Sequence, residues 1–103
     1  MEQDIARAKK IAAGDNVAFK DLFDEFGSGV LNLCYAMVRD RFDAEDIMQE
    51  VFVEIFCSIK SYRGNSKLST WIYRIAVNKS INFIRKQKVR RLFAGREKKT
   101  LEN

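Results

Sequence analysis

The sequence predicts an all-α domain, and its composition carries that prediction. The chain has 103 residues, of which 47% are hydrophobic and eight are Phe, enough for one packed core. It contains no Pro and few turn dipeptides, so little in it forces a helix to end. We therefore expect a compact bundle of about four helices, in which a long C-terminal helix follows a loop.

The first two helices follow from apolar spacing and from the residues that bound it. Asp4–Ala13 is expected to be a short helix with one apolar side, which Gly14 stops. Asp15 caps a second helix that reaches about Arg39, because apolar residues recur there at steps of three and four. Gly27–Gly29 lies inside this helix, and each Gly costs about 1 kcal/mol relative to Ala. A kink or break is expected there.

The third helix is expected to run from Asp43 to about Ile59, with carboxylates in its first turn, where the helix dipole favours them. One of its faces is wide and apolar. The other face has no Lys or Arg at helical spacing and carries Asp46, Gln49, Glu50 and Glu54. From this pattern alone, a solvated face is a simpler interpretation than a docking surface.

The fourth helix is predicted to follow a loop at Ser61–Lys67. Asn65 or Ser66 is its expected N-terminal cap, and the helix runs to about Arg91. A narrow polar stripe lies between its two apolar sides and comprises Lys67, Arg74, Asn78, Arg85 and Lys88. Residues 92–103 are polar and weakly patterned, as in a linker.

The two halves of the chain have opposite charge. Residues 1–57 contain 6 Lys/Arg and 12 Asp/Glu, whereas residues 58–103 contain 13 Lys/Arg and 2 Asp/Glu. The net charge of +5 hides this division. We expect two surfaces for two partners, a basic one for a polyanion and an acidic one for something cationic.

The basic half has the side chains that melted or single-stranded nucleic acid requires. Cations neutralise phosphates, aromatic rings stack on unpaired bases, and amides bond to base edges. Rings and amides accompany the cations at Tyr62, Trp71, Tyr73, Asn65, Asn78 and Asn82. Tyr62 is expected to be accessible because it lies in a loop, whereas Trp71 is either a helix–helix contact or a base contact. Asn78 either faces solvent or has a specific partner, since burying an unpaired amide is costly.

Other classes of function are disfavoured by what the chain lacks. Without His, imidazole catalysis is excluded and a zinc site would need unusual ligands. Cys34 and Cys57 lie among apolar residues, which predicts buried, reduced thiols. No nucleotide-binding loop or catalytic triad occurs, so we expect neither an enzyme nor a cofactor. Since no signal segment or long apolar run is present, we expect a cytoplasmic protein that does not insert into a membrane.

Four motifs occur along the chain in order. They are Gly14-Asp15 with Ala18-Phe19, the segment DAEDIMQEVF at 43–52, Tyr62-Arg63-Gly64, and the segment STWIYRIAVN at 69–78. Their order and separation resemble the second conserved region of bacterial extracytoplasmic-function (ECF) sigma factors. The resemblance covers about residues 5–91. It implies a sigma region 2 domain at 1–91 and, at 92–103, the start of an interdomain linker or the end of a piece of a longer protein.

The resemblance assigns a partner to the acidic stripe. In such sigma factors the third helix docks on the Arg-rich clamp helices of the RNA polymerase β′ subunit. By resemblance, the polymerase-binding residues are Asp46, Gln49, Glu50, Val53 and Glu54. This implication replaces the solvated-face interpretation.

The resemblance also makes the fourth helix a recognition helix. In the family, the loop and this helix recognise the promoter minus-ten element on the non-template strand and hold a base flipped out of the stack. By resemblance, the DNA-binding residues are Tyr62, Arg63, Gly64, Asn65, Ser66, Lys67, Trp71, Arg74, Asn78, Asn82, Arg85, Lys86 and Lys88. Tyr62 stands where the family often has Phe, and the loop varies among relatives, so the preferred promoter sequence is not readable from the chain.

Two alternatives stay open beside the sigma-factor hypothesis. The chain could be a protein-interaction module held by an anti-sigma factor, a partner that the family commonly has, or a small basic RNA-binding protein. The family normally carries a second, helix-turn-helix domain, which does not occur in these residues. We expect the isolated domain to be monomeric and to bind promoter duplex poorly.

Overall fold

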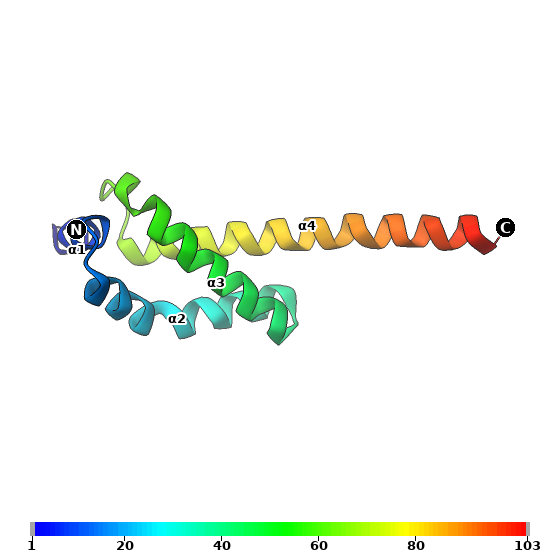
Figure 1. Cartoon of the computed structure of the whole chain (residues 1–103), viewed down its shortest axis with the longest axis horizontal. Coiled ribbons are helices and arrows are strands. Elements are labelled where there is room, and N and C mark those ends of the chain that lie inside the picture. Colours follow the sequence, from blue (N-terminus) through cyan, green and yellow to red (C-terminus); the bar gives the residue numbers. More distant parts are fainter. Residues whose placement is uncertain (1, 103) are drawn as a thin grey trace.

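The computed structural model consists of four α-helices and one short 3-10 helix, and it describes the backbone of residues 2–102 and the side-chain surroundings of residues 2–94. The elements are α1 (Glu2–Ala12), α2 (Asn16–Val38), α3 (Arg41–Ser58), η1 (Ile59–Ser61) and α4 (Leu68–Glu102) (Figure 1). The all-α prediction, with a long last helix after a loop, is confirmed.

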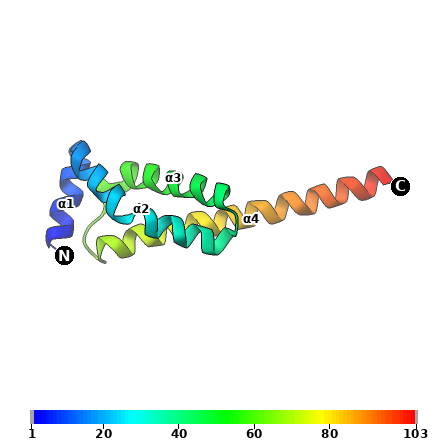
Figure 2. The ribbon, with the colours of Figure 1, turned by 90° about the horizontal axis from the view of Figure 1, so that it is seen from below.

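The bundle is formed by α2, α3 and the first half of α4, which lie side by side in both views (Figures 1 and 2). The short α1 lies across one end of this bundle, beside η1 and the start of α4. The second half of α4 projects beyond the other end, which explains the elongated dimensions of 63 × 22 × 21 Å.

The hydrophobic core is drawn from every element. Each buried Val, Leu or Ile contributes about 1.5–3 kcal/mol. The fully buried members of the core include Leu22, Val30, Val51, Ile55, Ile59, Leu68 and Ile72. On α4 the buried positions recur every four residues from Leu68 to Ser80, and none lies between residues 81 and 94. Only the first part of α4 is therefore held by the core.

Capping residues decide where α2 and α3 begin. The Ala18 N–H donates to Asp15 Oδ1 at 3.0 Å, as predicted for α2. The predicted start of α3 at Asp43 is wrong by two residues, because Asp40 is the cap and accepts from the Asp43 N–H at 2.9 Å. Asp43 still lies in the first turn, where its charge complements the helix dipole.

The expected break at the glycines of α2 does not occur, since α2 is one helix through Gly27–Gly29. Gly29 serves packing instead. A Cβ on Gly29 would clash with the hydroxyl oxygen of Tyr73, so this position lets α4 approach α2 closely.

Two further expectations need correction. Cys34 is buried as expected, and burial raises the pKa of its thiol, but Cys57 is exposed because it lies on the outer side of α3. The fourth helix does not end near Arg91 but continues to Glu102.

Within residues 2–102, no helix is both long and apolar enough to cross a membrane.

Candidate functional site

The loop between η1 and α4, residues 62–67, is supported from beneath and from within. Gly64 has a φ of 79°, a left-handed conformation that favours glycine. A Cβ at Gly64 would approach Ile5 Cδ1 to 2.7 Å, so the loop rests directly on α1. Within the loop, the Tyr62 hydroxyl donates to the Ser66 carbonyl oxygen at 2.6 Å. These contacts define the path of the loop.

Tyr62 is not the accessible ring that its loop position predicted. Only 7% of the residue is exposed. The centroid of its ring lies 5.8 Å from the centroid of the Trp71 ring, and the two ring planes are inclined at 59°. Burial, and secondarily the charge of Asp4, raises the pKa of Tyr62. The buried ring of Tyr62 therefore anchors the loop to the body of the domain. A direct role of Tyr62 in DNA binding stays a prediction.

The start of α4 is capped from a distant part of the chain. The Leu68 N–H donates to Asp4 Oδ2 at 3.0 Å, which replaces the predicted cap at Asn65 or Ser66. The Trp71 N–H donates to the Lys67 carbonyl oxygen at 3.0 Å and closes the first turn. Reasoning from local sequence missed Asp4, because it lies 64 residues away and nothing in α1 marks it as a cap for another helix.

The polar side chains predicted to bind DNA form an open surface on the loop and α4. The exposed ones are Arg63, Asn65, Lys67, Arg74, Asn78, Asn82, Arg85, Lys86 and Lys88, whereas Gly64, Ser66 and Trp71 are partly buried. Asn78 is exposed to solvent, which is the first of the two arrangements predicted for its amide.

Asn78 lies between two shallow hollows. One, of about 380 Å³, is lined by Ser69, Thr70, Tyr73, Arg74, Val77 and Asn78. The other, of about 280 Å³, includes Asn78, Trp71 and Asn82 with residues from the end of α3. Trp71 packs against the ring of Tyr62 and also lines the second hollow, so a base contact by Trp71 stays a prediction.

The acidic face of α3 is also a single surface. All five residues predicted to bind polymerase line one hollow of about 550 Å³, together with Cys57 and Lys79. They are Asp46, Gln49, Glu50, Val53 and Glu54. Val53, in the middle of this group, is 63% exposed. The structure therefore offers a carboxylate surface with an apolar centre.

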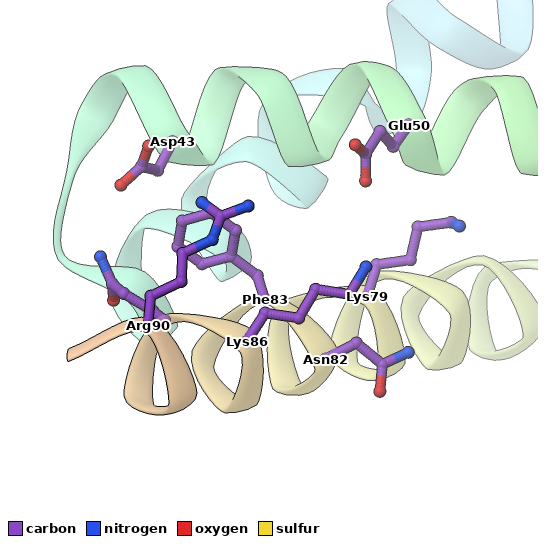
Figure 3. A pocket seen from close by; sticks show the side chains of 8 residues that line it. Asp43, Glu50, Lys79, Asn82, Phe83, Lys86 and Arg90 are labelled. Carbon is purple, nitrogen blue, oxygen red and sulfur yellow. The ribbon is translucent and has the colours of Figure 1, made fainter. Parts of the chain in front are cut away.

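A groove separates the acidic face of α3 from the basic side of α4 (Figure 3). Asp43 and Glu50 on α3 point toward the cationic side chains that rise from α4. The groove has a volume of about 410 Å³, and its cations are Lys79, Lys86 and Arg90. Lys79 Nζ also lies 3.8 Å from Glu54 Oε1. The oppositely charged halves of the chain therefore face each other, a relation that helical spacing within α3 could not reveal.

The fold matches a known protein family. The model of sigma-70 region 2 matches residues 22–90, which include α2 from Leu22 onward, α3, the loop and the packed part of α4. The chain belongs to the sigma-70 region 2 family. The match begins after α1, so the helix that supports the loop lies outside it. Sigma-70 region 2 is a family of transcription factors and not of enzymes.

Relatives of this sigma-70 region 2 chain include ECF sigma factors, as the sequence motifs indicated. It is 44% identical over 82 residues to ECF RNA polymerase sigma factor SigW from Bacillus subtilis, covering 80% of this chain and 44% of the relative. It is 34% identical over 83 residues to the RNA polymerase sigma-H factor from Pseudomonas aeruginosa, covering 81% and 43%. The chain thus spans less than half the length of these curated relatives.

Among solved structures, the sigma-70 region 2 chain is similar to an engineered region 2 of sigmaE in complex with GTAAAA. The TM-score is 0.75 at 33% identity, and the alignment covers 84% of this chain and 90% of that one. The similarity extends over nearly all of the neighbour, so the two domains share their fold.

Proposed function

We propose that this sigma-70 region 2 domain docks on core RNA polymerase through α3 and captures bases of the promoter minus-ten element with the 62–67 loop and α4. The observation that carries the proposal is the structural neighbour bound to the hexamer GTAAAA. The domain would work in the cytoplasm, where bacterial polymerase acts, and as a monomer when isolated.

The surface of the loop and α4 supports the DNA part of the proposal. Arg74 and Asn78 stand on one exposed side of α4, and Asn65 and Lys67 are exposed on the loop before it. Cations there hold phosphates, while the amides accept or donate at base edges. Extruding a base costs a few kcal/mol, which edge and stacking contacts at the hollows beside Asn78 can offset.

The acidic face of α3 supports the polymerase part. Its carboxylates suit the Arg-rich clamp helices that the family implies, because Arg pairs well with carboxylates at interfaces. Val53 supplies an apolar contact at the centre of the same hollow. An interface with an apolar centre and a charged rim is typical of specific protein association.

An anti-sigma factor is a second candidate partner for the same side of the domain. One observation favours it: Phe56 on α3 and Val17 on α2 remain 56% and 70% exposed, and polymerase docking on the carboxylates does not require them. Exposed large apolar side chains commonly mark protein contacts.

The DNA part of the proposal is tested by comparing the affinity of the domain for a single-stranded DNA with its affinity for an RNA of the same sequence. We expect the chain to prefer the DNA strand that it selects from a randomised pool. Asn78→Ala should weaken that binding about threefold to tenfold by removing an amide contact. Asn32→Ala, at an exposed amide on α2, is the control and should bind like the wild type. A strong preference for RNA would contradict the proposal.

A further inference from the structure

We propose that α1 is a positioning element for base capture: Asp4 and Ile5, which need not touch DNA, hold the start of α4 and the 62–67 loop in the geometry that receives a base. This inference rests on the proposed function. It concerns a helix that lies outside the residues matched by the family model, which begin at residue 22.

The first part of the argument is the hydrogen bond from the Leu68 N–H to Asp4 Oδ2, at 3.0 Å and partly buried. The first four N–H groups of a helix lack partners within the helix, and a carboxylate there also complements the helix dipole. The loop residues that could serve as a local cap, Asn65 and Ser66, are left free of that task. Asn65 is exposed and available to a ligand as a result.

The second part is the contact between Ile5 and Gly64. The left-handed backbone of Gly64 turns the loop over α1, and the Ile5 side chain fills the space where a Cβ would otherwise lie. Ile5 is itself packed against the core. The underside of the loop thus rests on a side chain with little freedom to move.

The third part is that Asp4 and Ile5 are neighbours in α1, so one rigid helix fixes two sides of the proposed base pocket. Ile5 fixes the height of the loop, and Asp4 fixes the first turn of the helix that carries Asn78. A pocket held in its binding geometry does not lose affinity to the entropy of ordering it. Removing either contact should therefore reduce base selection more than attraction to phosphates.

The test compares Asp4→Ala and Asp4→Asn with the control Glu2→Ala, which removes an exposed carboxylate from the same turn of α1. The probes are the DNA strand selected by the wild type and oligo-dT of the same length, each at several salt concentrations. Asp4→Ala should bind the selected strand about fivefold to thirtyfold more weakly, the range expected for loss of a helix cap. Binding to oligo-dT and the salt dependence should change little, because the phosphate contacts remain.

Two further readouts separate positioning from general stability. The first is the selectivity of Asp4→Asn, which retains an acceptor oxygen and should recover part of the selectivity lost in Asp4→Ala. The second is hydrogen exchange: the Leu68 amide should exchange faster in Asp4→Ala, while amides of α3 remain protected. If Asp4→Ala lowers global protection, Ile5→Ala decides instead, since it frees the underside of Gly64 and leaves the cap intact.

Equal selectivity in wild type and in a folded Asp4→Ala or Ile5→Ala variant would overturn the inference. Failure of the proposed function has a different signature. In that case the wild type itself would select no strand, whereas the effect on the Leu68 amide would still be measurable.

Discussion

The acidic face of α3 and the 62–67 loop are both exposed, polar surfaces of one domain, but they are built differently. The acidic face consists of residues of a single helix at positions 46, 49, 50, 53 and 54, which helical geometry alone places together. The loop depends on contacts from three sources: α1 beneath it, a hydrogen bond within the loop itself, and the start of α4.

This difference separates two kinds of sensitivity to substitution. On α3 a change acts chiefly through the charge or size of the side chain that is replaced, since the buried residues on the other face hold the helix in the core. Around the loop a change can act at a distance, because residues without access to a ligand determine where the exposed ones lie. The following predictions test that contrast in order of decreasing effect.

The largest effect is expected for Gly64→Ala. The substitution places a Cβ 2.7 Å from Ile5 Cδ1 and forces an L-residue into a left-handed conformation. We expect a loss of about 2–4 kcal/mol in the free energy of unfolding and loss of selective strand binding. Chemical denaturation and strand titration measure the two effects.

Gly14→Ala is the matched control for that prediction. Gly14 has a φ of 96°, but nothing lies within 4 Å of a Cβ built there. It should cost about 1–2 kcal/mol from backbone strain alone and leave strand binding intact. Equal effects of the two substitutions on strand binding would show that the contact with Ile5 is unimportant.

A smaller effect is expected on the acidic face. Glu50→Arg reverses one exposed charge in the proposed polymerase surface and should weaken binding to a β′ clamp-helix fragment about tenfold or more. Binding to single-stranded DNA should persist, since the substitution adds positive charge. Glu2→Arg is the control for net charge, and equal loss of both activities in folded Glu50→Arg would contradict the division of surfaces.

The smallest effect concerns alkaline pH at the loop. The pKa of Tyr62 is raised above its ordinary value of 10.0, chiefly by burial, so folding favours the neutral phenol. The resulting stability is complete below pH 10 and is lost as the pH rises through the pKa of the folded state. Tyr62→Phe should show a shallower loss of the unfolding free energy between pH 9 and about pH 11 than the wild type.

Exposed Tyr35, replaced by Phe, is the control for the loss of a phenol. The same alkaline slope in wild type and Tyr62→Phe would mean that the phenol beneath the loop does not favour the neutral form on folding.

Local sequence predicted the elements well and their junctions less well. Asp15 was recognisable as a cap because its acceptor lies three residues from the N–H that it bonds. The sequence predicts that α3 begins at Asp43, whereas Asp40 is the residue that caps it. The sequence predicts a kink or break at Gly27–Gly29, since it does not show that Gly29 meets the Tyr73 hydroxyl of another helix.

The candidate site shows the same division. Asp46 to Glu54 could be grouped from spacing, and the cations and amides of α4 could be placed on an exposed side. The accessibility of Tyr62 could not be predicted from its loop position, because Trp71 and α1 enclose it. The ion pair between Glu54 and Lys79 was equally hidden, since the two residues lie on different helices.

The helical elements, the charge of each half and the family can be inferred from the amino-acid sequence alone, because these depend on residue type, short-range periodicity and ordered motifs. The folded structure was needed to show that Asp4 caps α4, that Ile5 supports Gly64 and that the acidic and basic halves face each other across a groove. The physical reason is separation along the chain. A helix repeats every 3.6 residues and can be inferred locally, whereas contacts across many tens of residues exist only after the core has brought the helices together.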